Sequence, residues 1–203
     1  MIRVITNYRV ALDSNDHIYP EATMKDDTPD SGFLDEVEKV FGGECIAIMD
    51  LGCAGGRFIA QVHERGHRAA GLEGSDYSLV NARASWPEYG GKVLFNCDIS
   101  RPFTVMENGN PVLFDVVTAW EFWEHIPQER LVCAIDNIWA HMKPGGLLCA
   151  TINLMTGLHH RTCKSVEWWL EMFAPRFLQV QDSGLTHPVR SEGVYVVFRR
   201  AKD

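Results

Sequence analysis

The stretch CIAIMDLGCAGGR at residues 45–57 decides how this chain folds. It begins with an apolar run that ends in Asp50, which is typical of a buried strand, and continues into a glycine-rich turn. A helical pattern follows from about Arg57. A strand, a glycine turn and a helix in this order form the first half of a βαβ unit, so the flanking sequence should continue the alternation.

Strands and helices do alternate outward from this turn. Further strands are predicted at residues 69–73, 92–97, 114–119, 147–152, 177–181 and 194–198, and helices at 31–41, 57–65, from Asp76 to about Trp86, at 131–142 and at 166–173. The alternation predicts a doubly wound, mostly parallel α/β sheet with helices on both faces. The last two strands have no helical pattern between them, so the final strand is expected to insert antiparallel.

The N-terminal 30 residues do not show this alternation. They are polar, and Pro20 and Pro29 break any regular pattern. We expect residues 1–30 to form an irregular N-terminal arm and residues 31–203 to form one domain, because 203 residues suit a single domain.

Composition limits the partners and the compartment. The net charge is −8, from 19 basic and 27 acidic residues, so the surface should repel nucleic acid. The N-terminus lacks the layout of a signal peptide, and no apolar run approaches the ~20 residues of a membrane span. The six cysteines contain no C-x-x-C pair and look like reduced, buried thiols. We expect a cytoplasmic protein that binds neither nucleic acid nor membrane.

The chemistry-bearing residues follow the predicted strands. Gly52 lets the backbone approach a ligand closely, and Glu73 ends the second strand 21 residues later. A carboxylate at that place can accept both hydrogen bonds of a ribose diol. With Asp98 after the third strand, this pattern predicts an adenosine site with a free 2′-hydroxyl. The alternative is a turn that only packs strand against helix, with Glu73 as a solvated charge.

The turn departs from the dinucleotide fingerprint G-x-G-x-x-G. Ala54 takes the place of the second glycine and Arg57 that of the third. Asp50, two residues before the first glycine, would repel a diphosphate but suits a cation such as a sulfonium with an ammonium group. An NAD-dependent oxidoreductase is therefore a disfavoured alternative, and a non-catalytic binding module is another.

The stretch IMDLGCAGGRFIA at residues 48–60 resembles the first motif of class I methyltransferases that depend on S-adenosylmethionine. GLEGSDYS at 71–78, the triplet at 97–99, FDVVTAWEFWEHI at 114–126 and MKPGGLL at 142–148 resemble the later motifs in the same order. The resemblance implies a Rossmann-like methyltransferase fold with a seven-stranded sheet whose last strand is antiparallel. It also implies S-adenosyl-L-methionine as the cofactor.

The same resemblance implies roles for individual residues. Glu73 would bind the ribose, Asp98 the adenine amino group and Ile99 the adenine ring, while the backbone around Gly52 and near Trp120 would hold the methionine part. The cofactor-binding residues expected on this basis are Asp50, Gly52, Cys53, Ala54, Gly55, Glu73, Gly74, Asp98, Ile99 and Trp120. Cys53 serves as a small residue in the turn and not as a nucleophile.

Histidines follow the fourth and fifth strands, at the edge where an acceptor must enter. Methylation of a hydroxyl is helped by a general base, and histidine is the usual one near neutral pH. We expect His125 or His160 to be catalytic. The alternative is that the pair Glu124 and His125 only supports the cofactor pocket.

A metal site is a further alternative. Glu121, Glu124, His125 and His160 would together supply oxygen and nitrogen ligands for a divalent ion. This set resembles the metal quartet of small-RNA terminal methyltransferases. The spacing to the later histidine differs, however, and the basic character of an RNA binder is missing, so we expect no metal.

These observations favour methyl transfer to an oxygen, and less readily to a nitrogen, of a small molecule or glycan. A glycan is included as a possible acceptor because of the N-terminal stretch at residues 14–33, SNDHIYPEATMKDDTPDSGF. This stretch resembles methyltransferases encoded beside glycosyltransferases. The alternatives are a metal-dependent RNA terminal methyltransferase and an NAD-dependent oxidoreductase.

Overall fold

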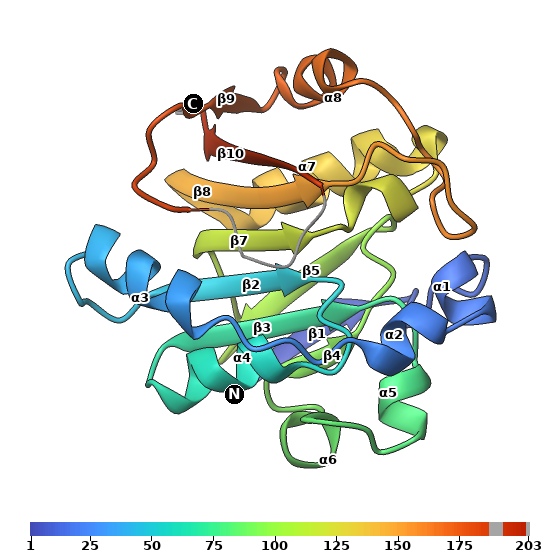
Figure 1. Cartoon of the computed structure of the whole chain (residues 1–203). Helices are drawn as coiled ribbons and strands as arrows, with labels where there is room; N and C mark the ends of the chain where they lie inside the picture. The colour runs from blue at the N-terminus through green and yellow to red at the C-terminus, as the bar shows by residue number, and fades with distance from the viewer. Residues whose placement is uncertain (187–192, 202–203) are drawn as a thin grey trace.

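A seven-stranded sheet forms the centre of the protein, in the order β4-β3-β2-β7-β8-β10-β9 (Figure 1). This computed structural model describes residues 1–186 and 193–201. The strands of the large sheet are β2 (Ala47–Leu51), β3 (Arg68–Glu73), β4 (Leu94–Asn96), β7 (Phe114–Trp120), β8 (Met142–Ile152), β9 (Phe177–Gln179) and β10 (Val194–Arg200).

The directions of these strands agree with the prediction. The pairs β2–β3, β3–β4, β2–β7 and β7–β8 are parallel, whereas β10 lies antiparallel between β8 and β9. The prediction of a doubly wound, mostly parallel seven-stranded sheet with an antiparallel last strand is confirmed. The strand order reverses between β2 and β7, which is where ligands bind in open α/β sheets.

Helices cover both faces of the sheet. They are α3 (Ser31–Val40), α4 (Arg57–Glu64), α5 (Tyr77–Val80), α6 (Trp86–Tyr89), α7 (Leu131–His141) and α8 (Val166–Phe173). In β2, Ile48 packs into the core that holds α3 and α4, and the next residue, Met49, packs into the core that holds α7 and α8. Successive side chains of a strand point to opposite faces, and both faces of β2 are buried, so its residues do not alternate between apolar and polar.

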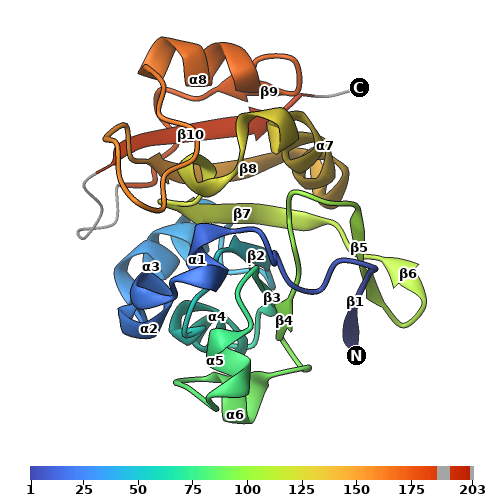
Figure 2. The same ribbon diagram turned by 90° about the vertical axis from the view of Figure 1, so that its right-hand side faces the viewer.

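The prediction that residues 1–30 are irregular is wrong. They contain β1 (Ile2–Thr6), α1 (Asn15–Ile18) and α2 (Glu21–Lys25). β1 pairs with β5 (Phe103–Glu107), and β6 (Asn110–Pro111) completes a separate three-stranded sheet. Figure 2 looks toward the carboxyl ends of the parallel strands and shows α1 and α2 lying there beside α5. The division of the chain at residue 30 stays a prediction.

The structure bears on two of the sequence expectations, the absence of a membrane span and the burial of the cysteines. Among the described helices, none combines the length and the apolar character that crossing a bilayer requires. All six cysteines are free, and Cys53, Cys97 and Cys149 are buried. The prediction of buried thiols is wrong for Cys45, which is exposed, and Cys133 and Cys163 are only partly buried.

Candidate functional site

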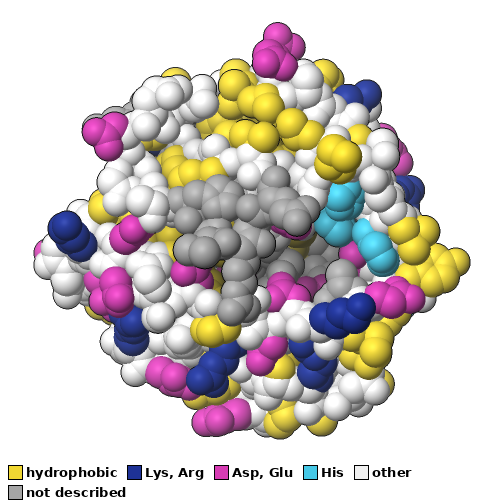
Figure 3. Space-filling model, viewed as in Figure 1, with side chains coloured by type: hydrophobic (Ala, Val, Ile, Leu, Met, Phe, Trp, Pro, Cys, Tyr) yellow, Lys and Arg dark blue, Asp and Glu magenta, His cyan; other side chains and the backbone are white. Residues whose placement is uncertain are grey.

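A cavity of about 560 Å³ opens at the carboxyl ends of β2, β3 and β7, where the strand order reverses. Figure 3 shows the surface hollowed there, with histidine side chains beside the opening. Its volume lies in the range of small-molecule and cofactor sites. The cavity is lined by most of the residues predicted to bind the cofactor, namely Asp50, Gly52, Cys53, Ala54, Glu73, Gly74, Asp98, Ile99 and Trp120.

Gly55, which is expected to bind the cofactor, contacts the N-terminal segment in the structure. Its N–H donates to the carbonyl oxygen of Asp26 at 3.1 Å, and a Cβ atom added to it would lie 2.4 Å from Oδ1 of Asp27. The glycine therefore lets the N-terminal segment approach the turn closely, and Gly55 is not among the residues that line the cavity.

The glycine turn takes its shape from left-handed backbone conformations and from the end of β3. Gly52 has φ +73° and Ala54 has φ +44°. The N–H groups of Gly52 and Cys53 both donate to the carbonyl oxygen of Leu72, at 2.8 and 3.2 Å. A Cβ atom on Gly52 would lie 3.1 Å from Cδ2 of Phe122, so both the conformation and the space favour glycine here.

Three carboxylates at the cavity are buried, with Asp50 5%, Glu73 6% and Asp98 6% exposed. Asp50 accepts a hydrogen bond from the Thr118 hydroxyl at 2.6 Å. Burial raises the pKa of Asp50 and of Glu73 to about 7, although hydrogen bonds to each carboxylate oppose the shift. Asp98 accepts hydrogen bonds at Oδ1 from the backbone N–H and the hydroxyl of Ser100, at 3.0 and 2.5 Å.

This set of donors and acceptors fits the cofactor implied by the sequence. Buried carboxylates favour a ligand that brings positive charge or hydroxyl and amino donors. Asp50, Glu73 and Asp98 approach the cavity from three neighbouring strand ends, so they can meet separate parts of one extended ligand. Each carboxylate oxygen has two lone pairs, so the hydrogen bonds within the protein leave acceptor capacity for a ligand.

The two predicted catalytic histidines lie together. His125 ends the 3₁₀ helix Trp123–His125 after β7, and His160 lies in the segment between β8 and α8. Their ring centroids are 5.1 Å apart, and both side chains line the cavity. Nδ1 of His160 lies 2.6 Å from the carbonyl oxygen of Met155, which can only accept, so this nitrogen carries the proton.

Glu124 connects the end of β7 to the segment after β8. Its Oε1 accepts the N–H of Asn153 at 2.9 Å, and its backbone carbonyl accepts the N–H groups of Arg161 and Thr162. Burial raises the pKa of Glu124 to about 7. These contacts suit the supporting role that the sequence left open for this residue.

Glu124 also belongs to a possible metal-binding group. One ligand atom from each of Glu124, His125 and His160 lies within 4.8 Å of the others. Oε2 of Glu124 is buried and has no hydrogen-bond partner in the described parts of the chain. Glu121, the fourth residue of the alternative quartet, does not belong to this group. The expectation that the site works without a metal stays a prediction.

The N-terminal segment contributes residues to the cavity that the sequence patterns do not indicate. Asp13, Ser14, Asp16, Asp26 and Asp30 from this segment line the cavity. The local sequence contained one indication, because Ser14 caps α1 by accepting the N–H of Asp16 at 3.2 Å. A short capped helix within a polar stretch does not by itself indicate that the segment returns to the sheet.

Sequence comparison identifies relatives of the chain. Residues 49–148 match a family model described as a methyltransferase domain. A ubiquinone biosynthesis O-methyltransferase from Idiomarina loihiensis is 30% identical over 124 residues, which cover 60% of this chain and 48% of that protein. The corresponding enzyme from Nitrosomonas europaea is 28% identical over 170 residues, covering 79% and 69%. The chain thus spans about half the length of the first of these relatives.

Solved structures share the fold. The N-methyltransferase NodS from Bradyrhizobium japonicum, in complex with S-adenosylhomocysteine, superposes with a TM-score of 0.61 at 16% identity and covers 93% of this chain and 100% of that one. An S-adenosylmethionine-dependent methyltransferase from Clostridium acetobutylicum gives 0.62 at 15% identity, covering 92% and 97%. Sequence identities this low show only that these proteins share the fold of this chain. The matched methyltransferase domain, the related methyltransferases and the strand-end motifs place this chain in the class I methyltransferases that depend on S-adenosylmethionine.

Proposed function

We propose that this protein transfers a methyl group from S-adenosylmethionine to an oxygen of a small molecule. The observation that carries the proposal is one cavity at the switch point of the sheet, lined both by buried carboxylates and by the histidines. The relatives are named as O-methyltransferases, which supports oxygen over nitrogen as the acceptor atom.

The carboxylates would hold the cofactor. Glu73 is suited to the ribose hydroxyls, Asp98 and Ile99 to the adenine, and the buried carboxyl group of Asp50 to the cationic methionine end near Gly52, whose positive charge favours the ionised form of that carboxyl. When bound, S-adenosylmethionine supplies an activated methyl group on a sulfonium whose sulfur is the leaving group. The protein then has to align the acceptor and exclude water, so few catalytic side chains are needed.

A histidine would serve as the general base. In that step the acceptor hydroxyl gives its proton to an imidazole nitrogen while its oxygen bonds to the methyl carbon, and the electron pair of the broken carbon–sulfur bond stays on sulfur. His125 and His160 both line the cavity, so either is placed for this role. The imidazolium then returns its proton to water.

The charge of the residues that line the cavity limits which class of methyl acceptor it can bind. Among the described lining residues, eight are Asp or Glu, whereas Arg130 is the one Arg or Lys, and it pairs with Asp13. An uncharged small molecule or glycan is therefore better suited than a polyanion. The alternatives of an RNA terminal methyltransferase and an NAD-dependent oxidoreductase gain no support from the relatives named above.

Calorimetry and a turnover assay test the proposal together. S-adenosylhomocysteine should bind, and NAD should bind much more weakly. Incubation with S-adenosylmethionine and a panel of catechols, hydroxybenzoates and monosaccharides should give S-adenosylhomocysteine and a product heavier by one CH₂ group, with the new methyl on oxygen by fragmentation. NAD binding of equal strength would refute the cofactor assignment, and methylation confined to amine acceptors would refute the assignment to oxygen.

A further inference from the structure

The N-terminal segment, residues 11–30, crosses the cavity and is tied to its rim at several points. The N–H of Ala11 donates to the carbonyl oxygen of Gly74 at 2.9 Å, beside the predicted ribose position. The side-chain amide of Asn15 donates to the carbonyl oxygen of Leu158 at 2.6 Å, on the histidine side. The segment therefore joins the cofactor side of the cavity to the side where the acceptor must enter.

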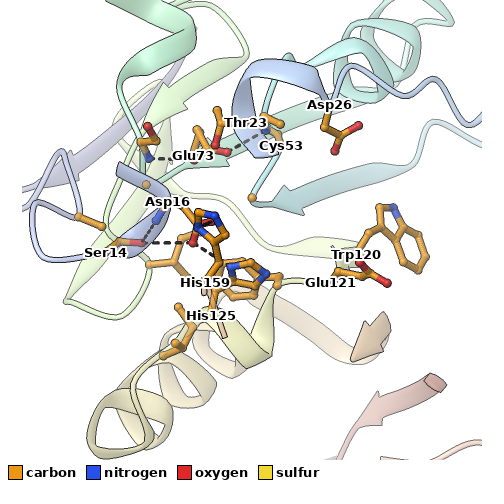
Figure 4. Close-up of a pocket in the computed structure, with 18 of the residues that line it drawn as sticks. Ser14, Asp16, Thr23, Asp26, Cys53, Glu73, Trp120, Glu121, His125 and His159 are labelled. Atoms are coloured by element: carbon orange, nitrogen blue, oxygen red, sulfur yellow. Dashed lines mark hydrogen bonds and ion pairs between the residues drawn. The ribbon is translucent and has the colours of Figure 1, made fainter. Parts of the chain in front are cut away.

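Asp16 in α1 lies between two histidines of the cavity (Figure 4). Its Oδ2 is 2.8 Å from Nδ1 of His125 in hydrogen-bond geometry. Its Oδ1 is 3.2 Å from Nδ1 of His159, which is an ion-pair distance only. The three side chains are 18–19% exposed, so the carboxylate is largely shielded from water. The aligned hydrogen bond of Asp16 thus goes to His125.

This hydrogen bond determines which nitrogen of His125 can act as a base. A carboxylate only accepts, so Nδ1 of His125 must carry the proton and Nε2 keeps its lone pair. The negative charge of Asp16 also stabilises the imidazolium that proton transfer would create. Its effect is already present in the resting protein, because Asp16 raises the pKa of His125 against the opposing effect of burial.

The other carboxylates that act on His125, Glu121 and Glu124, act in the same sense as Asp16. Glu121 and Glu124 add to the raised pKa of His125 through their charges alone, whereas Asp16 also supplies a hydrogen bond. The pKa of Asp16 is lowered by its hydrogen bond to His125 and by the charges of His125 and His159, although burial opposes this shift. The lowered pKa of Asp16 and the raised pKa of His125 are consistent with each other, because both favour the charged forms of the pair.

We infer that Asp16 is the positioning residue for His125, holding its imidazole with the lone pair on Nε2 so that His125 acts as the base. The inference rests on the proposed function and selects between the two candidate histidines. His160 is oriented by a carbonyl from its own segment, whereas His125 needs a carboxylate from the far end of the chain. The base is then complete only when α1 is docked over the cavity.

The tautomer of His125 gives a test that needs no acceptor. Long-range ¹H–¹⁵N spectra of the full chain saturated with S-adenosylhomocysteine, recorded above the pKa of its histidines, distinguish a protonated Nδ1 from a protonated Nε2. His125→Gln identifies the signals. We expect Nδ1–H in the unmodified protein, a shift toward Nε2–H in Asp16→Ala, and retention of Nδ1–H in Asp16→Asn, whose amide oxygen still accepts.

Asp13→Ala is the matched control, because it removes a carboxylate from the same segment that pairs with Arg130 and not with His125. It should leave the His125 tautomer unchanged. With an acceptor found in the panel, Asp16→Ala should lower kcat about tenfold or more and leave KM for S-adenosylmethionine within about twofold, with Asp16→Asn in between.

The outcomes separate this inference from the proposed function. Nε2–H in the unmodified protein, or an unchanged His125 tautomer in folded Asp16→Ala, would overturn the role of Asp16 even if methylation occurs. If Asp16→Ala fails to fold, the unmodified protein and Asp16→Asn still decide the tautomer. Absence of S-adenosylhomocysteine binding would overturn the proposed function and leave the Asp16–His125 pair as a structural contact.

Discussion

The carboxylate of Glu73 accepts a hydrogen bond from the backbone N–H of Ala54 at 2.8 Å, which joins the end of β3 to the glycine turn after β2. Its second oxygen accepts the N–H of Ser75 at the same distance. Glu73 therefore shapes the turn that would hold the cofactor, and it also lines the cavity itself. Its substitution should affect both ligand binding and the stability of the ligand-free protein.

Glu73→Gln keeps the size of the side chain but replaces one acceptor oxygen with an NH₂ donor. A ribose hydrogen bond to a charged group is lost, so affinity for S-adenosylhomocysteine should fall about ten- to a hundredfold by calorimetry at about pH 8. One buried backbone N–H also loses its acceptor, which costs roughly 1–3 kcal/mol and opposes the stability that the variant gains at about pH 8 because it no longer titrates. Glu64→Gln, an exposed change on α4, is the control. Unchanged affinity in folded Glu73→Gln would remove Glu73 from the ligand site.

Asp98 is expected to bind the adenine amino group. Asp98→Ala removes a charge-assisted hydrogen bond worth about 1.5–3 kcal/mol, so affinity for S-adenosylhomocysteine should fall at least about tenfold. Ser100→Ala removes the hydroxyl that bonds to Asp98 and keeps the carboxylate, so its affinity should stay within a few-fold of the unmodified protein. Calorimetry should be done on variants with unchanged circular dichroism. If both variants lose the same affinity, Asp98 acts only by holding the segment after β4 in place through Ser100.

The large sheet could be predicted from the sequence because its central strands, such as β2 and β7, are largely buried and mostly apolar and are followed by a turn. The helix at 166–173 was predicted with the bounds observed for α8. The small sheet could not be predicted in this way. β1 and β5 are short and half-exposed, and they become recognisable only through their pairing across about a hundred residues of sequence.

The same distinction applies to the site. Glu73 and Asp98 could be found because the carboxyl ends of parallel strands meet at one edge of the sheet. Asp16 could not be found, because its contact with His125 depends on where a separate segment docks. The resemblance of the turn suggests Gly55 for the cofactor, but the spacing of glycines does not tell which way the backbone faces, so it could not show that Gly55 contacts the N-terminal segment.

Stability should depend on pH through the buried carboxyls. Asp50 and Glu73 keep their protons in the folded protein up to a pKa of about 7, whereas unfolded carboxyls lose theirs near pH 4. The folded state therefore binds more protons between these values, and this contribution to the free energy of unfolding falls as pH rises from about 4 to about 7 and is constant above that range. The melting temperature of the ligand-free protein should fall over this interval.

Asp50→Asn isolates this effect, because its amide oxygen can still accept from Thr118 while the titration is removed. The variant should show a flatter dependence of melting temperature on pH and should melt above the unmodified protein at about pH 8. Asp182→Asn, on the exposed surface, should follow the unmodified protein. Parallel curves for Asp50→Asn and the unmodified protein would mean that Asp50 is ionised in the folded state throughout.

The last prediction concerns metal at Glu124, His125 and His160. Glu124 already bonds to Asn153, and His125 and His160 are held through Nδ1 by Asp16 and Met155, so internal contacts account for how all three are placed. We therefore expect EDTA to leave turnover of an acceptor from the panel unchanged, and Mg²⁺, Mn²⁺ or Zn²⁺ to leave the melting temperature unchanged. His160→Gln is the matched variant, since it removes a nitrogen from the metal-binding group and leaves the Asp16–His125 pair intact. Activity that EDTA abolishes and a divalent ion restores, together with an ion-induced rise in melting temperature that His160→Gln loses, would show that these residues bind a metal and that the general-base mechanism must be replaced.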